Sequence, residues 1–168
     1  MSKSLVITPA PQTITWANLA TRQFSTSANT VTLAATSSSG LAVTYSVTSG
    51  PATVSGSTLT VTGAGTVVIA ANQVGNANYL AATAVRKSLV VSKGTATVTI
   101  GNLTQNYNGQ RKTVSWTTVP AGLTAFATYD GSLTAPTGAF LQTKRFDVVV
   151  TVNDPNWQGQ ATGTLTIK

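Results

Sequence analysis

Apolar residues alternate with Thr and Ser along most of the chain, and this period of two constrains the fold more than any other feature. In residues 146–152, for example, Val148, Val150 and Val152 share one face, and Phe146 begins that face. Side chains that alternate in this way lie on opposite faces of a β-strand, whereas a helix needs a period near 3.6. Thr and Val are also β-branched and stiff at χ1, which favours a pleated sheet. The pattern predicts an all-β protein with almost no helix.

Short segments with this alternation recur in both halves of the chain. In the first half we expect strands at residues 13–16, 30–35, 43–47, 58–62, 66–71 and 86–91. In the second half we expect strands at residues 96–100, 113–117, 123–128, 145–152 and 162–167. Turns rich in Gly, Ser, Asn and Pro separate them at intervals typical of a β-sandwich. The chain is therefore expected to form two tandem immunoglobulin-like β-sandwich domains with a short linker.

A short internal repeat marks the expected domain boundary. Residues 4–7 (Ser-Leu-Val-Ile) resemble residues 88–91 (Ser-Leu-Val-Val), and residues 164–168 form a looser third copy. The second and third copies are expected to be the final strands of their domains. This gives an N-terminal arm at residues 1–10, a first domain at 11–92 and a second domain at 93–168.

The first copy of the repeat contains Leu5, Val6 and Ile7. Two interpretations are open. The segment is either a leftover strand, from an upstream domain or paired within the first domain, or an assembly arm that adds to the edge of a neighbouring subunit. The preceding residues carry one Lys, and the apolar run of three is shorter than the roughly 7–15 residues of a secretory signal. A fragment of a secreted protein and a virion component made in a host cytoplasm both fit this start.

Composition narrows the class of protein. Charged residues make up 8% of the chain, far below the roughly 25% of ordinary globular domains. No apolar run approaches the roughly 18–20 residues of a membrane-spanning helix, so membrane insertion is not expected. The chain contains no Cys, so disulfides cannot stabilise it and the apolar core alone must do so.

Groups that perform catalysis are scarce. The chain has no His, Cys or Glu, and its only acidic side chains are Asp130, Asp147 and Asp154. Catalytic triads, Cys nucleophiles and the usual zinc sites are therefore excluded, and a glycosidase would need two converging carboxylates. Asp130 and Asp154 lie in turns, where Asp commonly hydrogen-bonds to backbone. A calcium site at residues 153–156 is the less favoured alternative. We expect no enzyme activity, no cofactor and no metal.

Several motifs carry a family resemblance. The first half resembles bacterial immunoglobulin-like repeats at residues 11–16, 41–47, 49–56, 63–67 and 75–79. The second half resembles the MBG-type or YDG repeat at residues 102–109, 120–124, 129–132 and 152–159. Such repeats occur in large bacterial surface proteins and in phage structural proteins. The resemblance implies the immunoglobulin-like fold, and roles as spacers, adhesive modules or decorations.

A departure from the MBG-type pattern suggests a docking surface. Phe140 and Leu141 are apolar where a small turn is expected, and they either cap the core or form a docking patch. The net charge of +7 includes the adjacent pairs Arg86-Lys87, Arg111-Lys112 and Lys144-Arg145. Such pairs either protect strand edges or bind an acidic partner. The candidate docking residues are Phe140, Leu141, Lys144, Arg145, Arg111 and Lys112.

The aromatic residues are expected to have structural roles. Those within strands should pack the cores: Trp16, Tyr45, Trp116, Phe126 and Phe146. Those near turns are expected to pack corners: Tyr79, Tyr107, Tyr129 and Trp157. No basic groove with interleaved aromatics is present in the pattern, so a nucleic-acid partner is not expected.

Together these features predict a non-enzymatic structural or interaction protein. The favoured hypothesis is a decoration or appendage component of a larger assembly, located on a virion surface. The alternative is a fragment of a secreted bacterial adhesin or cell-surface protein that binds glycan or protein. A protein partner or self-assembly is expected in either case, with an acidic surface or a glycan as further possible targets.

Overall fold

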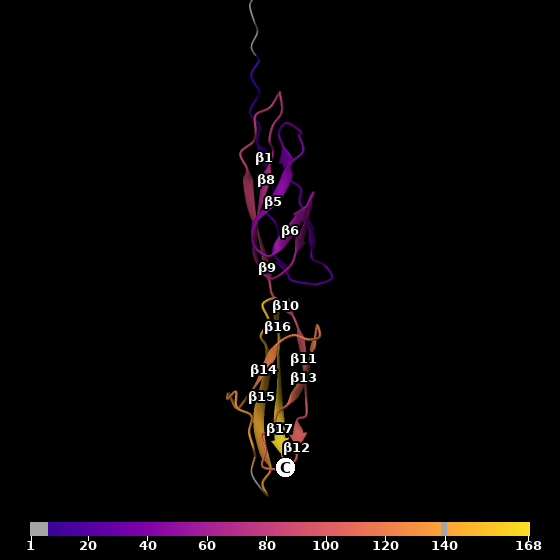
Figure 1. Ribbon diagram of the computed structural model, residues 1–168, viewed down its shortest axis with the longest axis vertical. Coiled ribbons are helices and arrows are strands. Elements are labelled where there is room, and N and C mark those ends of the chain that lie inside the picture. The colour runs from indigo at the N-terminus through magenta and orange to yellow at the C-terminus, as the bar shows by residue number, and fades with distance from the viewer. Residues whose placement is uncertain (1–6, 139–140) are drawn as a thin grey trace, which may run out of the picture. The chain divides into compact units, whose positions relative to one another are not determined.

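The computed structural model describes residues 7–138 and 141–168, and these residues form strands, turns and loops without any helix (Figure 1). The chain divides into two compact units, Met1–Ser92 and Lys93–Lys168, called unit 1 and unit 2 below. Each unit is an immunoglobulin-like β-sandwich, which confirms the predicted fold class. In the described part of the chain, no helix is long and apolar enough to cross a membrane.

Unit 1 is built from two main sheets. Its strands are β1 (Ile14–Thr15), β2 (Arg22–Gln23), β3 (Thr30–Thr32), β4 (Thr36–Ser37), β5 (Thr44–Ser49), β6 (Ala52–Ser55), β7 (Thr58–Val61), β8 (Gly65–Asn72) and β9 (Val85–Ser92). One sheet has the order β2-β9-β8-β5 and the other has the order β3-β7-β6, while β1 pairs with β4. The first of these sheets ends on a parallel pair, β2 with β9.

Unit 2 repeats the larger sheet of unit 1. Its strands are β10 (Gly94–Thr95), β11 (Thr97–Gly101), β12 (Thr104–Gln105), β13 (Ser115–Val119), β14 (Ala125–Tyr129), β15 (Lys144–Val152), β16 (Trp157–Gln158) and β17 (Gln160–Ile167). The order β12-β17-β15-β14 matches β2-β9-β8-β5, and β12 is again parallel to β17. The opposite sheet contains β11 and β13, and β10 pairs with β16.

Each unit has its own apolar core, formed by the inward faces of the predicted strands. In unit 1 the most buried large side chains include Leu59, Ile69 and Leu89. In unit 2 they include Leu165 and Ile167. Burial of apolar area stabilises the folded state by roughly 25 cal/mol per Å². These cores are therefore the main source of stability in a chain without disulfides.

The alternation predicted from the sequence is confirmed within these cores. Val148, Val150 and Val152 are buried, and Phe146 packs against the same cluster. Leu59 and Val61 are buried together in unit 1. The prediction missed short strands, namely β2, β4, β6, β10, β12 and β16. Apart from β6, each of these has only two residues, too few for a period of two to be visible.

Candidate interaction surface

The same kind of turn fixes Ala10 in unit 1 and Gly94 in unit 2. In unit 1 the Asn76 side chain accepts hydrogen bonds from the backbone N–H groups of Asn78 (2.8 Å) and Tyr79 (3.0 Å). The carbonyl of Asn78 then accepts a hydrogen bond from the N–H of Ala10 (2.8 Å), and the N–H of Leu80 donates to the Ala10 carbonyl (2.9 Å). Ala10 is thereby fixed beside the connection between β8 and β9.

Unit 2 repeats this turn with Asp154 in place of Asn. The Asp154 carboxylate accepts hydrogen bonds from the N–H groups of Asn156 (2.8 Å) and Trp157 (3.1 Å). The Asn156 carbonyl accepts from the N–H of Gly94, also at 2.8 Å. The sequence copies at 4–7 and 88–91 precede Ala10 and Gly94 at the same spacing, so sequence repeat and structural repeat are in register.

The turn predicts a specific difference between two substitutions. Asp154→Ala should lower the free energy of unfolding of unit 2 by about 1–2 kcal/mol, because two backbone N–H groups lose their acceptor. Asp154→Asn should cost much less, because an Asn amide oxygen already performs this role at residue 76. Urea unfolding of the full chain measures both. Equal losses would show that the negative charge, and not the acceptor oxygen, stabilises the turn.

Asp130 and Asp147 lie opposite each other where β14 meets β15, and the Asp130 carboxylate is bound to backbone. The Asp130 side chain accepts a hydrogen bond from the N–H of Asp147 (2.7 Å), and the Asp130 N–H donates to the Asp147 carbonyl (2.8 Å). The prediction that each Asp binds the backbone of its own turn is confirmed for Asp154 and wrong for Asp130, which binds the backbone of β15. Within the described residues, no three His, Cys, Asp or Glu side chains gather in one place.

The candidate arm is only partly described. Leu5 and Val6 lie outside the described residues, whereas Ile7 is described and its side chain is 84% exposed. Ile7, three residues before the fixed Ala10, is an apolar side chain that its own unit does not cover. The role of Leu5, Val6 and Ile7 as an assembly arm stays a prediction.

The candidate docking residues gather at one end of unit 2. Lys144 and Arg145 begin β15 and are exposed, with Lys144 paired to Ile167 at the end of β17. Arg111 is exposed and Lys112 is half-buried in the loop before β13. The N–H of Lys112 donates to the Pro136 carbonyl (2.7 Å), which places this loop beside the connection from β14 to β15. This end of unit 2 therefore carries all four of the candidate cationic side chains.

Leu141 lies in the same connection, and Phe140 lies outside the described residues. The Leu141 side chain is 87% exposed on a backbone with φ 59°. Leu141 therefore does not cap the core, and its role in docking stays a prediction. Left-handed φ is uncommon for a residue other than Gly and is often found where a loop has a specific role.

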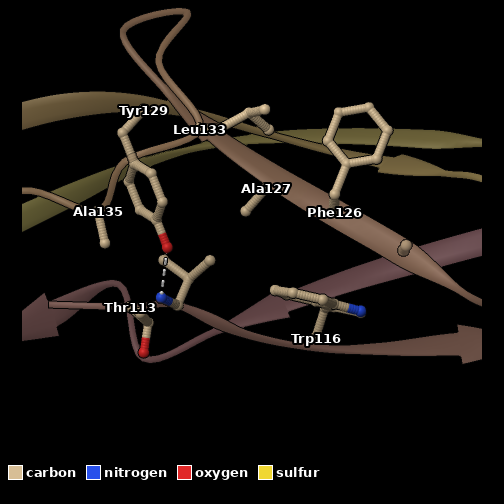
Figure 2. A pocket seen from close by; sticks show the side chains of 9 residues that line it. Thr113, Trp116, Phe126, Ala127, Tyr129, Leu133 and Ala135 are labelled. Atoms are coloured by element: carbon tan, nitrogen blue, oxygen red, sulfur yellow. Dashed lines mark hydrogen bonds between the residues drawn. The ribbon is translucent and has the colours of Figure 1, made fainter.

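A groove of about 490 Å³ opens between β13 and β14. Its lining residues are mainly apolar: Thr113, Val114, Trp116, Ala125, Phe126, Ala127, Tyr129, Leu133 and Ala135. In Figure 2, Ala127 points from β14 toward Trp116, whereas the Phe126 ring points away from it. The Tyr129 hydroxyl accepts a hydrogen bond from the Val114 N–H (3.0 Å), which closes one end of the groove.

The sequence did not indicate this groove. Phe126 was expected in the core, and that expectation is wrong: its side chain is 40% exposed. Ala125, Ala127 and Tyr129 occupy the inward positions of β14, so the alternation places Phe126 on the outer face. Leu133 is 72% exposed and lies outside every segment in which apolar and polar residues alternate. The one indirect sign in the sequence was the long stretch between residues 128 and 145 in which no strand was expected.

Comparison with known proteins agrees with part of the predicted resemblance. The sequence profile of the MBG domain matches residues 96–168. The resemblance of the first half to bacterial immunoglobulin-like repeats stays a prediction. No curated protein matches the chain.

Solved structures with a similar arrangement of strands include the EC1–4 segment of Drosophila N-cadherin. The alignment has 7% sequence identity and a TM-score of 0.41, and it covers 92% of this chain. It covers 49% of the cadherin chain, so this chain spans about half the length of that structure.

Proposed function

We propose that this chain is a non-enzymatic, extracellular repeat module that builds and decorates a surface assembly through protein contacts. The observation that supports this proposal best is the repeated way in which the chain passes through each unit. In each unit an early residue, Ala10 or Gly94, is hydrogen-bonded to the turn of Asn76 or Asp154. The chain of each unit then ends with a long final strand, β9 or β17. Such units can be linked in series without rearrangement, as in other repeat proteins.

The proposed assembly is a larger particle, such as a virion, on which the chain is a decoration or appendage component. Two features support a docking role: the cationic end of unit 2, with Arg111, Lys144 and Arg145 exposed, and the exposed apolar side chains of Ile7 and Leu141. A cationic rim favours an acidic protein surface or an acidic glycan.

A repeat of a bacterial cell-surface protein is the second candidate, and the MBG-domain match over residues 96–168 favours it. Both candidates place the chain on an outer surface, but on different bodies. Antibodies raised against the full chain, used for immunogold labelling of particles and of cells from the natural source, separate them.

Label on virion particles supports the decoration role, and label on the cell envelope supports the adhesin role. Arg145→Ser with Lys144→Ser should weaken binding to the labelled body, and this loss should be greatest at low salt because the interaction is electrostatic. Arg86→Ser with Lys87→Ser is the matched control, since it removes the same charge from unit 1. Label confined to the cytoplasm would refute both roles.

A further inference from the structure

The two units differ at the strand that lies beside the groove. In unit 1, β7 lies between β3 and β6, and its Leu59 and Val61 are 0% and 2% exposed. In unit 2, β13 precedes β14 as β3 precedes β5, but β13 pairs only with β11 among the described residues. In unit 1 the β6–β7 hairpin lies between β5 and β8. The matching connection of unit 2, between β14 and β15, has no strand in residues 130–138 or 141–143. Unit 2 therefore has no described counterpart of the β6–β7 hairpin, and the groove lies beside β13, the counterpart of β3.

The open edge of β14 has backbone groups that can bind another strand. The Asn153 N–H donates to the Thr124 carbonyl, and the Asp130 N–H donates to the Asp147 carbonyl, both at 2.8 Å. In an antiparallel pair, hydrogen-bonded positions alternate, so even-numbered residues of β14 bind β15. The N–H and C=O groups of Ala125 and Ala127 consequently point toward the open edge. Their small side chains leave the groove beside them open.

We propose that this edge binds residues Leu5, Val6 and Ile7 from the arm of a second copy of the chain. The inference deepens the proposed function and rests on it, because it names the site that the arm would occupy. The added strand would bond to Ala125 and Ala127 of β14 and insert two alternate side chains into the groove.

The pattern of the arm fits this site. Leu5 and Ile7 are alternate residues, so in an added strand their side chains share one face. With Leu5 and Ile7 directed toward Trp116, Val6 faces the other side of β14. There it would cover the Phe126 ring, which is exposed. Both faces of the arm strand thus meet apolar partners.

A second copy is required because the arm is too short to leave its own unit. Ala10 is fixed at the end of unit 1 where β9 begins. β9 has eight residues and spans about 26 Å. The five residues from Ala10 back to Leu5 reach at most about 17 Å. Leu5 therefore cannot pass beyond the far end of its own unit 1.

This contact joins different surfaces of the two copies. Heterologous contacts of that kind form open chains unless a rotation closes them into a ring. The expected product is a head-to-tail oligomer that grows with protein concentration.

Sedimentation velocity of the full chain over a range of concentrations tests this. The unaltered chain should form oligomers. An arm variant, Leu5→Ser with Ile7→Ser, and a groove variant, Phe126→Ser with Leu133→Ser, should each weaken self-association at least about tenfold, because each loses buried apolar contacts. A mixture of the two variants should form a one-to-one complex that grows no further, since it retains one intact arm and one intact groove. Val74→Ser, on an exposed side chain of unit 1, is the control.

The absence of Cys allows a second test that does not depend on affinity. Val6→Cys with Phe126→Cys should form disulfides between copies under mild oxidation, and Val6→Cys with Val74→Cys should not. A monomeric chain that shows no cross-link overturns the proposed contact, as does a disulfide within a single chain. If the chain is monomeric but immunogold label is found on particles or cells, the arm contact is refuted and the proposed function is not. If the chain forms oligomers but no surface is labelled, the proposed function is refuted and the arm contact is not.

Discussion

Replacement of Leu59 by Ala is expected to lower the free energy of unfolding of unit 1 by about 2–5 kcal/mol. Leu59 lies at the centre of β7, opposite Val31 of β3 and Val54 of β6, and its side chain is fully buried. The substitution removes apolar area and leaves a cavity that close-packed neighbours cannot fill. Because a whole domain is usually stable by only about 5–15 kcal/mol, the loss is a large fraction of the total.

Native-state hydrogen exchange, resolved by peptide, measures this effect for each unit separately. Leu59→Ala should speed exchange in β7, β8 and β9, while Leu165→Ala should do the same in β15 and β17. Leu141→Ala is the control, because its side chain is exposed and its loss should change stability by less than about 0.5 kcal/mol. If Leu141→Ala cost as much as Leu59→Ala, the burial assigned to β7 would be wrong.

Gly75→Ala is expected to have the second large effect. Gly75 has φ of +78°, in the left-handed region, and a Cβ there would overlap the backbone of Tyr79, Leu80 and Ala81. The backbone conformation costs about 1–2 kcal/mol for a residue with a Cβ. Displacing the neighbouring backbone adds about 1–3 kcal/mol, as overpacking does elsewhere. Leu80 also binds Ala10, so the start of unit 1 should loosen too.

Gly40 provides a matched control for this substitution. Its φ is +75°, but a Cβ at Gly40 would meet no atom within 4 Å. Gly40→Ala should therefore show only the backbone cost, and the difference between the two variants isolates the overlap with residues 79–81. Urea unfolding gives both values, and hydrogen exchange at Ala10 and Leu80 reports the loosening. Equal costs for the two variants would show that the turn adjusts freely.

The fold class was predictable because, in long strands, the alternation of apolar and polar residues indicates which side chains are buried. β15 is the best case: Val148, Val150 and Val152 alternate with less buried residues, and all three lie in the core. The same rule could not identify β2 or β12, which have two residues each. These strands form because their backbone groups hydrogen-bond to β9 and β17. Such pairing depends on tertiary structure and leaves no pattern in the local sequence.

The candidate sites were less predictable for a related reason. Alternation shows that neighbouring residues of a strand lie on opposite faces, but not which face is the core. Phe126 was expected in the core because aromatic side chains in strands usually are. The smaller Ala125 and Ala127 occupy that face instead, and the shallow space above them is the groove. A groove between two strands that are not paired with each other can be recognised only from their arrangement in space.

The parallel pairs at the edges of the two larger sheets have a mechanical consequence. In each unit an early strand, β2 or β12, runs parallel to the last strand, β9 or β17. Tension applied to the two ends of a unit would slide these strands past each other along their length. Their hydrogen bonds would then resist together in shear, and would not open one after another as in a zipper. A chain with these connections is suited to remain folded while it is stretched between two bodies.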